Sequence, residues 1–430
     1  MFLVTLVLAS GIGAAYPHDL TRSAERPDLI VVMVDDLGAI DSRILERLPN
    51  IKALFLDSGL SFDQYYGEDP LCCPARATFL TGQHVRNHHV TKNDARLLDP
   101  SRTVATALHD AGYWTVLTGK YLNLAELLED RSPPGWDRVD MLLGADKTYA
   151  FNPDASVWSV DDQSVVLDQY RDRAGLEFSV AEVEAAPPDQ PLFLWSTPRA
   201  PHWGTSNRVP WKPAVEARYA ADERCDGIEP WKPPSYGYAR KPDGFPLGEV
   251  CRALLTVDEE VGELQAAVAA RGRDAVWFFT GDNGMSWGAH GFPLKRNPWA
   301  TRLPLYVAGR GIDAGSTDAL ESQIDLGPTL AEMGGAVMPW ADGSSFAGVL
   351  FGQPGGREWM IEDQPHGGYT GGRYQRKWRA VRTLRWHLIR FGDTNYLYDL
   401  SADPWEMHDV RSEHHYVFRK LRGLFPFWWR

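Results

Sequence analysis

Side chains capable of acid–base or metal chemistry stand where four apolar segments of this sequence end. Unbroken apolar runs that contain β-branched residues predict strands buried on both faces of a parallel sheet. Open α/β sheets bind their ligands at the carboxyl ends of such strands. We therefore expect these residues to meet at one edge of a sheet: Asp35 and Asp36 after 29–34, Lys120 after 113–117, His202 after 191–195, and Asp282 and Asn283 after 275–280.

The two adjacent carboxylates, Asp35 and Asp36, would repel each other unless a cation lay between them. Asp282 and Asn283 would add two further oxygen ligands at the same edge. A hard divalent cation prefers carboxylate and amide oxygens to sulfur or imidazole. The four residues therefore predict a Ca²⁺ site, with Mg²⁺ as the alternative. A solvated turn would explain one aspartate after a strand, but it explains the pair less well.

Cys72 opens the pattern C-x-P-x-R, which Pro74 and Arg76 complete. About 0.03 matches to this pattern are expected by chance in a chain of this composition. A helix over 76–81 would direct the positive end of its dipole toward Cys72, which favours an anion there. The alternative interpretation is an ordinary helix start at which buried cysteines only fill space.

Three cations, Arg76, Lys120 and Lys295, could together hold a tetrahedral oxyanion. Cys72 would supply a nucleophile and His202 a proton donor. This combination predicts displacement at sulfur or phosphorus in an anionic ester. Two further histidines, His88 and His290, are candidates for the wall of the substrate pocket.

With these residues assembled, the chain resembles the type I sulfatases of the alkaline phosphatase superfamily, in which the first cysteine of the motif is oxidised to formylglycine (3-oxoalanine). The likeness runs from about residue 29 to residue 400 and is greatest to the N-acetylglucosamine-6-sulfatase and arylsulfatase branch. The segments that carry it are LCCPAR at 71–76, NHHV at 87–90, GKYLN at 119–123, IDLGPT at 324–329, LYDL at 397–400 and Asp403-Pro404.

The resemblance implies hydrolysis of sulfate monoesters, either aryl or carbohydrate sulfates, by a formylglycine hydrate derived from Cys72. It implies a sulfated small molecule or glycan as substrate, and a formylglycine-generating enzyme as a partner during maturation. The implied roles are calcium ligation by Asp35, Asp36, Asp282, Asn283 and the modified Cys72, support of formylglycine by Arg76, sulfate binding by Lys120 and Lys295, and proton donation to the leaving alcohol by His202.

Two departures from the family pattern bear on the substrate pocket. Many sulfatases have Lys-x-His where this chain has Leu122 in place of the histidine, and His88 is a candidate substitute. Trp299-Ala300 stand where the family usually has an aromatic residue followed by Glu. Two alternative functions therefore stay open: a phosphonate monoester or phosphodiester hydrolase of the same superfamily, and an inactive homologue that binds sulfated glycans while Cys72 remains a thiol.

The element pattern predicts an α/β fold with a large, mixed, mostly parallel sheet between layers of helices. Helices are expected over 44–57, 103–111, 249–271 and 324–333, and another strand over 303–308. Short strands joined by turns at 378–381, 386–390 and 396–400 predict a small antiparallel sheet, followed by a helix over 417–424. We therefore predict a catalytic domain over 25–345 and a C-terminal subdomain over 346–430.

Charge, cysteines and the first residues bear on the setting of the protein. A net charge of −13 over 430 residues argues against a nucleic-acid partner. Residues 1–15 predict a signal peptide and so an exported protein; the segment lacks basic residues at its start and is too short for a stable membrane span. Cys225 and Cys251 could close a loop as a disulfide, which suits an exported protein; two buried thiols are the alternative.

Overall fold

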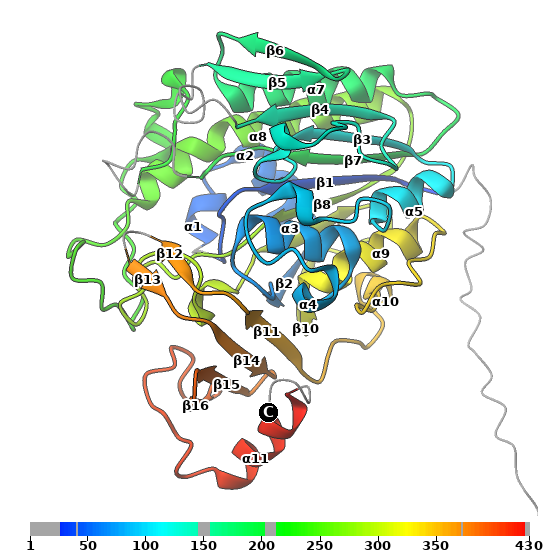
Figure 1. The fold of residues 1–430 in the computed structure, drawn as a ribbon. Helices are drawn as coiled ribbons and strands as arrows, with labels where there is room; N and C mark the ends of the chain where they lie inside the picture. Colours follow the sequence, from blue (N-terminus) through cyan, green and yellow to red (C-terminus); the bar gives the residue numbers. More distant parts are fainter. Residues whose placement is uncertain (1–25, 40–41, 145–154, 203–211, 371–372, 426–430) are drawn as a thin grey trace, which may run out of the picture.

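The computed structural model describes residues 26–39, 42–144, 155–202, 212–370 and 373–425. The predicted signal peptide, 1–15, lies outside the described residues. No helix within the described ranges is long and apolar enough to cross a membrane. The structure contains a large mixed sheet with helices and a small antiparallel sheet nearer the C-terminus (Figure 1), so the predicted α/β fold class is confirmed.

Ten strands form the large sheet in the order β10-β2-β9-β8-β1-β7-β3-β4-β5-β6. The strands β8, β1, β7, β3 and β4 run parallel to one another in its middle, and antiparallel pairs lie on both sides of them. The bounds are β1 Asp28–Val34, β2 Leu60–Tyr66, β3 Trp114–Gly119, β4 Arg138–Leu143, β5 Ser156–Val160, β6 Gln163–Leu167, β7 Leu192–Thr197, β8 Ala275–Gly281, β9 Leu305–Gly309 and β10 Gly315–Ser322.

Helices cover both faces of this sheet because the side chains of its central strands alternate between the faces. On β1, Leu29, Val31 and Met33 join one buried cluster with residues of α3, α5 and α9, whereas Ile30 and Val32 join another with residues of α8. The helices are α1 Ser42–Leu45, α2 Pro49–Ile51, α3 Cys72–Thr81, α4 Val85–His88, α5 Val104–Asp110, α7 Arg171–Ala185, α8 Leu247–Ala270, α9 Leu326–Met333, α10 Ala347–Leu350 and α11 His415–Leu424.

The single helix predicted over 44–57 is wrong, because the structure has several short elements there. The segment 44–57 is divided into α1, α2 and a π-helical turn over Lys52–Leu56. The division falls at Pro49, because the residue before a proline disfavours the helical region, and Leu48 is extended at φ −109°. No element was predicted from the sequence for β2, β4, β5, β6, β10 or α7.

The small sheet has the order β11-β14-β15-β16, with bounds Met360–Gln364, Trp378–Arg382, Trp386–Phe391 and Thr394–Asp399. Its predicted strands are present, and β11 is an additional one. A separate antiparallel pair, β12 Gly368–Thr370 with β13 Arg373–Gln375, lies between β11 and β14 in the chain. Val381, Leu388 and Leu397 pack with Leu421 of α11, so this sheet has a small core of its own. The domain boundary at 345 stays a prediction.

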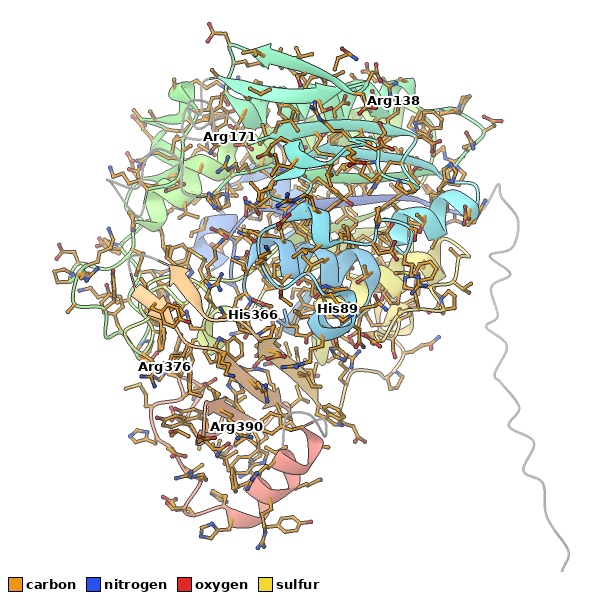
Figure 2. The ribbon with its side chains drawn as sticks, in the orientation of Figure 1. His89, Arg138, Arg171, His366, Arg376 and Arg390 are labelled. Atoms are coloured by element: carbon orange, nitrogen blue, oxygen red, sulfur yellow. A yellow bond between two sulfur atoms is a disulfide. The ribbon has the colours of Figure 1, made fainter. Side chains whose placement is uncertain are left out.

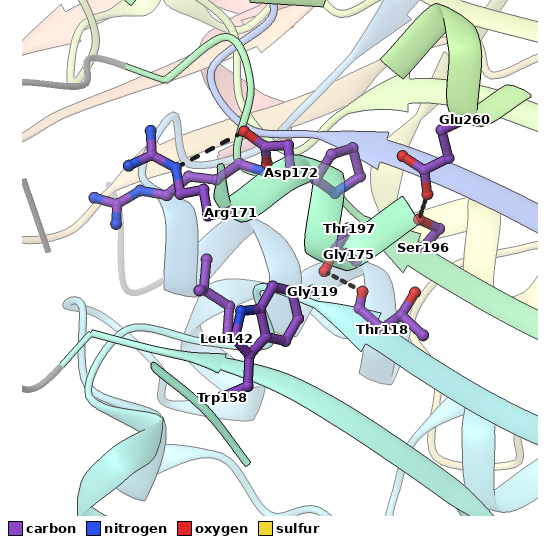
Figure 3. A pocket seen from close by; sticks show the side chains of 12 residues that line it. Thr118, Gly119, Leu142, Trp158, Arg171, Asp172, Gly175, Ser196, Thr197 and Glu260 are labelled. Carbon is purple, nitrogen blue, oxygen red and sulfur yellow. Dashed lines mark hydrogen bonds and ion pairs between the residues drawn. The ribbon is translucent and has the colours of Figure 1, made fainter. Parts of the chain in front are cut away.

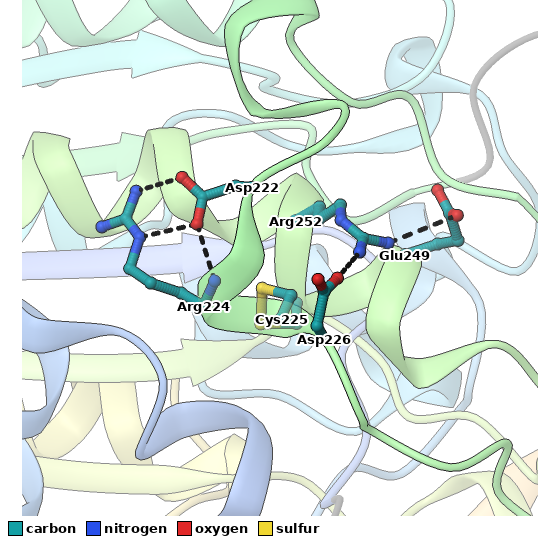
Figure 4. Close-up of a disulfide and its surroundings, with 7 residues drawn as sticks. Asp222, Arg224, Cys225, Asp226, Glu249 and Arg252 are labelled. Atoms are coloured by element: carbon teal, nitrogen blue, oxygen red, sulfur yellow. Dashed lines mark hydrogen bonds and ion pairs between the residues drawn. A yellow bond between two sulfur atoms is a disulfide. The ribbon is translucent and has the colours of Figure 1, made fainter.

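Cys225 and Cys251 form a disulfide, with their Cα atoms 5.7 Å apart (Figure 4). It ties a 3₁₀ turn over Glu223–Cys225 to α8. Beside it, Arg252 pairs with Asp226 across the same junction. The crosslink holds part of the long excursion between β7 and α8 against the helix, and a closed loop of this length contributes about 3–4 kcal/mol in the chain-entropy model.

Candidate active site

The acidic part of the site is formed where β1 and β8 end side by side. Val34 is in register with Gly281, so the aspartates that follow the two strands are neighbours. The backbone N–H of Asp36 donates to Asp282 Oδ1 at 2.9 Å, and Asn283 Nδ2 donates to Asp36 Oδ1 at 2.8 Å. Asp36 has a φ of +66°, a left-handed conformation that few residues other than glycine adopt. The carboxylates are thus held together by backbone pairing and by this turn.

Cys72 is the first residue of α3, and this helix brings it to the same place. Its side chain is 1% exposed. Its Sγ lies 3.6 Å from Asp35 Oδ1 and 3.1 Å from Lys295 Nζ. The helix begins after Leu71, which is extended, and ends at Gly82, whose φ of +63° suits glycine. The nucleophile candidate therefore lies between a carboxylate and an ammonium group at the positive end of a helix dipole.

Three cations surround the three carboxylates. Lys120 Nζ donates to Asp35 Oδ2 at 2.6 Å, and Lys295 Nζ pairs with Asp36 Oδ1. Arg76 Nε donates to Asp282 Oδ2 at 2.8 Å, and the same guanidinium bonds the backbone carbonyl of Lys120. Three negative charges thus meet three positive charges in a buried cluster. We call Asp35, Asp36, Cys72, Arg76, Lys120, His202, Asp282, Asn283 and Lys295 the catalytic cluster.

The catalytic cluster offers carboxylate and amide oxygens that suit a hard divalent cation, with a sulfur and an imidazole nitrogen beside them. One ligand atom each from Asp35, Asp36, Cys72 and His202 lie within 4.8 Å of one another. Asp36 Oδ2 and Asn283 Oδ1 are buried oxygens that accept no hydrogen bond among the described residues. Buried polar atoms normally have a partner, and a bound ion would supply one. His202 Nε2 is 3.5 Å from Asp36 Oδ2, so the structure brings this histidine to the cation ligands.

Burial and neighbouring charges shift the protonation equilibria in opposite directions. Burial raises the pKa of the Cys72 thiol to about 11, although Lys120 and Lys295 act against it. Burial also opposes ionisation of Asp35, but Lys120 and the other cations hold its pKa well below the usual range. Burial lowers the pKa of His202 to about 4 despite Asp35 and Asp36. At neutral pH the cluster therefore contains a protonated thiol, an ionised Asp35 and a neutral imidazole.

The two remaining histidine candidates lie elsewhere. His88 is buried behind α3, where Nε2 lies 3.1 Å from Thr78 Oγ1 and Nδ1 accepts from the backbone N–H of Val90. The ring of His290 stacks on Trp299 at 4.0 Å, and its Nε2 lies 3.1 Å from the carbonyl of Trp405. The structure joins neither to the catalytic cluster through these contacts, and their substrate-binding roles stay predictions.

Sequence reasoning missed Asp172 on α7, which supports the loop that carries His202. Its Oδ1 accepts from the backbone N–H groups of Arg199 and Ala200, at 3.2 Å in the second case. The carbonyl of Ala200 in turn accepts from Asp35 N at 3.2 Å. Finding this residue would have required recognising α7, whose buried face carries charged side chains and so lacks a clear apolar period.

The fold is α/β, with acidic and basic side chains gathered at one edge of its large sheet, and comparison with known proteins gives its family. The family model for Sulfatase matches residues 27–336, and the model for the N-sulphoglucosamine sulphohydrolase C-terminal region matches residues 288–422. Because the first covers more than half of the chain, the chain belongs to the sulfatase family.

Relatives named as several different sulfatases match this chain. N-acetylglucosamine-6-sulfatase of Capra hircus is 26% identical in a 370-residue alignment that covers 77% of this chain and 65% of that protein. Choline-sulfatase of Rhizobium meliloti (strain 1021) is 26% identical in an alignment 445 positions long, which covers 90% of this chain and 82% of that protein. Against the first relative, the chain thus spans slightly less than two thirds of its length.

Solved structures share the fold. A protein solved in complex with its substrate, D-glucosamine-2-N,6-O-disulfate, superposes with a TM-score of 0.77 at 20% identity, covering 93% of this chain and 96% of that one. At this identity the likeness establishes the architecture, while the site argument rests on the residues described above.

Proposed function

We propose that this chain hydrolyses sulfate monoesters, either carbohydrate or aryl sulfates, through a formylglycine hydrate formed from Cys72. The observation that carries the proposal is the position of Cys72, buried at the start of α3 between Asp35 and Lys295. A nucleophile at this position would meet an anionic ester among lysine and arginine side chains, which stabilise charge on the transferred group.

The proposed oxidation of Cys72 would replace a weak nucleophile by a better one. With its pKa raised to about 11 by burial, the unmodified thiol is protonated at neutral pH and is a weak nucleophile. A hydrated aldehyde instead offers two hydroxyl groups on one carbon. One hydroxyl oxygen bonds to sulfur as the bond between sulfur and the alcohol oxygen breaks. The other hydroxyl then loses its proton, the C=O bond forms again, sulfate leaves with the first oxygen, and water rehydrates the aldehyde.

The alcohol needs a proton as it leaves, and His202 is the proposed donor. Burial holds its pKa at about 4 in the protein described here. A bound sulfate ester would bring negative charge close to the imidazole, which raises its pKa and favours the protonated ring. Lys120 and Lys295 would bind the sulfate oxygens, and Arg76 would keep Asp282 and the backbone of Lys120 in position.

The proposed cation is Ca²⁺, with Mg²⁺ as the alternative. Asp35, Asp36, Asp282 and Asn283 would hold it, with the modified Cys72 as a further ligand. When bound, the cation supplies positive charge beside the attacking hydroxyl and lowers the pKa of that hydroxyl. Because the carboxylates and the basic side chains already balance, a divalent ion would also leave net positive charge for an anionic ester.

The relatives support a carbohydrate sulfate as substrate. One is an N-acetylglucosamine-6-sulfatase, and one structural neighbour is a complex with a disulfated glucosamine. We also propose export of the protein, since other relatives are named extracellular sulfatases, and maturation by a formylglycine-generating enzyme. The division into a catalytic domain over 25–345 and a C-terminal subdomain over 346–430 is part of the same proposal.

Two measurements test the function. The first is the ratio of kcat/KM for 4-nitrophenyl sulfate and for bis(4-nitrophenyl) phosphate, which we expect to favour the sulfate. A dominant phosphodiesterase rate would support the superfamily alternative instead. The second is mass spectrometry of the peptide that contains Cys72 in protein from the native host. Formylglycine is expected; an intact thiol in active protein would refute the mechanism, and an intact thiol in inactive protein would support a binding homologue.

A further inference from the structure

Two cavities in the described part of the chain differ in what they can hold. The smaller lies beside Arg171, Asp172 and Glu260 (Figure 3), and its volume of about 10 Å³ suits a single water molecule. The larger has a volume of about 240 Å³. Of these two, the larger alone has room for an organic ligand.

We call the larger one the junction cavity, because the small sheet and loops of the large sheet form it together. Its walls come from segments 231–235, 285–302 and 382–406, with Ala39 after β1 and with Gln64 and Tyr66 at the end of β2. Two lining side chains, Leu384 and Trp405, are 51% and 41% exposed, so the cavity reaches the surface.

The junction cavity is separate from the catalytic cluster. Among the described residues that line it, none belongs to that cluster. Met285 and Trp287 of its wall pack in the core on the α8 face of the large sheet, whereas Cys73, beside the nucleophile candidate, packs in the core on the α3 face. A ligand in this cavity would therefore leave the site around Cys72 open.

Aromatic rings give the junction cavity flat apolar walls. The rings that line it are those of Tyr66, Trp231, Trp287, Trp299 and Trp405. The ring centres of Trp231 and Trp405 lie 6.3 Å apart and their planes meet at 53°, so the two indoles form a corner. The face of an indole carries negative potential and attracts C–H groups. A ring with several C–H groups on one side would fit against such a wall.

Hydrogen-bonding atoms without partners stand beside these rings. Ser235 Oγ, Gln64 Nε2 and the indole N–H groups of Trp231 and Trp405 make no hydrogen bond with any residue that the structure describes. Arg302 uses only Nη2, which donates to the carbonyl of Asp63 at 2.7 Å. A hydrocarbon ligand would cover these groups without bonding to them, which is costly. The cavity therefore suits a ligand with several hydroxyl groups.

The charges of the lining residues disfavour an ionic ligand. Arg302 and Arg382 would repel a cation, and Glu406 would repel an anion. Arg382 and Glu406 also lie only 3.6 Å apart, from Nη2 to Oε1, so they largely neutralise each other. An uncharged ligand meets neither repulsion. A ring that is uncharged and hydroxylated, with C–H groups on its faces, is a pyranose.

The backbone supplies an independent observation. Trp287 and Glu406, which both line the junction cavity, have φ values of +50° and +58°. Residues other than glycine seldom adopt this left-handed conformation, and such conformations gather at ligand-binding sites. The two residues come from different parts of the fold, the loop after β8 and the segment after β16. Both parts are therefore shaped at the same cavity.

We propose that the junction cavity binds an uncharged saccharide unit. Its pyranose ring lies against Trp231 and Trp405. Its hydroxyl groups bond to Gln64, Ser235 and Arg302. The site binds without catalysing a reaction, and the inference goes beyond the proposed hydrolysis and does not rest on it.

Isothermal titration calorimetry of the full chain tests the proposal with two uncharged probes, N,N′-diacetylchitobiose and cellobiose. We expect at least one to bind with a dissociation constant of about 0.1–10 mM. Choline and phenol are the comparison ligands for a cation and for an apolar ring. Tighter binding of either than of both disaccharides would overturn the assignment of the ligand class, and no heat from either disaccharide up to about 50 mM would reject the site.

Variants locate the bound saccharide. Trp405→Ala should weaken its binding about tenfold and Arg302→Met at least about threefold, because each removes one kind of contact. Arg376→Met is the control, at an exposed arginine that directly follows β13 and does not line the cavity (Figure 2). Trp405 is 41% exposed, so its replacement should leave the melting temperature near that of the wild type. Equal affinities in Trp405→Ala, Arg302→Met and the control would place the saccharide elsewhere.

Two further measurements separate this site from the catalytic cluster. Cys72→Ala should bind the disaccharide as tightly as the wild type, and Trp405→Ala should keep its kcat for 4-nitrophenyl sulfate. Competition between the disaccharide and the aryl sulfate would place both in one site and overturn the inference. A wild type that binds the disaccharide but cleaves no sulfate ester would reject the proposed function alone.

Discussion

Two buried charged clusters in this molecule differ in whether their polar atoms have hydrogen-bond partners. The catalytic cluster leaves the oxygens Asp36 Oδ2 and Asn283 Oδ1 without hydrogen bonds in the described structure. The second, which we call the interface cluster, consists of Glu362, Arg382, His387 and Glu406 and lies where the small sheet meets the large domain. The first therefore has buried acceptors that a bound ligand could satisfy, whereas the side chains of the second bond to one another.

The contacts of the interface cluster form a closed network. Arg382 Nε donates to Glu362 Oε1 at 3.0 Å, and His387 lies between the two glutamates at 2.8 Å from Glu362 Oε2 and 3.0 Å from Glu406 Oε1. Thr301 and Trp299, from the segment between β8 and β9, donate to Glu362 and Glu406 at 2.8 Å each. The network therefore bonds the small sheet to the segment between β8 and β9, and we expect it to contribute to stability.

Replacing Cys72 is expected to give the largest difference in activity between variants of the two clusters. Cys72→Ala is expected to lower kcat for 4-nitrophenyl sulfate at least about a thousandfold, because the nucleophile is lost. Its melting temperature should stay close to that of the wild type. Cys73→Ala is the matched control, since this neighbouring buried thiol contacts Asn123 instead of the carboxylates. Equal losses in the two variants would contradict the assignment of the nucleophile.

A variant of the interface cluster is expected to lose stability and to keep its activity. Glu362→Ala should lower the free energy of unfolding by about 3–5 kcal/mol, because Arg382 is left as a buried charge without its carboxylate. Urea denaturation measures this change, and kcat of the folded fraction should remain near the wild-type value. Glu413→Ala, at an exposed position, is the control. A variant as stable as the wild type would mean that the network contributes little.

A divalent cation should stabilise the protein through the catalytic cluster and not through the interface cluster. Ca²⁺ at about 100 times its dissociation constant is expected to stabilise the wild type by about 2.7 kcal/mol, because it binds the folded state. Thermal denaturation with and without EDTA measures the shift. Asp36→Asn should lose most of the shift and Glu362→Gln should keep it. The same shift in both variants would place the cation elsewhere.

The dependence of the unfolding free energy on pH should reveal the ionisation of Glu362 in the interface cluster. Burial opposes ionisation of Glu362, but Arg382 and His387 lower its pKa to about 2. A depressed carboxyl pKa contributes stability that is present above the unfolded value of about 4.5 and is lost as pH falls toward 2. Between pH 5 and pH 3 the wild type should lose about 2 kcal/mol of stability that Glu362→Gln does not lose. Parallel denaturation curves for the two proteins would argue against this carboxylate.

The sequence could predict the middle of the fold and the strand-end residues for one physical reason. Strands buried on both faces are continuously apolar, so β1, β3, β7 and β8 and the polar groups after them stand out. β6, by contrast, lies at the sheet edge and contains only exposed and partly buried residues, and α7 buries Arg171, Asp172 and Glu182. Neither gives the pattern on which strand and helix predictions depend.

The contacts that loop residues make could not be predicted from the sequence, for a different reason. The distance between Lys295 and Cys72 depends on the path of the chain after β8, and the spacing of residues in sequence does not fix that path. The same holds for Asp172, whose hydrogen bonds to the loop after β7 became visible only with the position of α7. The types of residue in the catalytic cluster could thus be inferred, but their pairing required the structure.

The burial of Cys72 also imposes an order of events during synthesis. A side chain that is 1% exposed is out of reach of another protein once the chain has folded. Its neighbours include Asp35 and Lys295, and β8 must pair with β1 before the pocket around it closes. Because β8 is translated long after Cys72, the unfinished chain has a period in which this cysteine is accessible. The proposed oxidation of Cys72 by an enzyme would have to occur in that period, and early folding would then yield stable protein that lacks the proposed nucleophile.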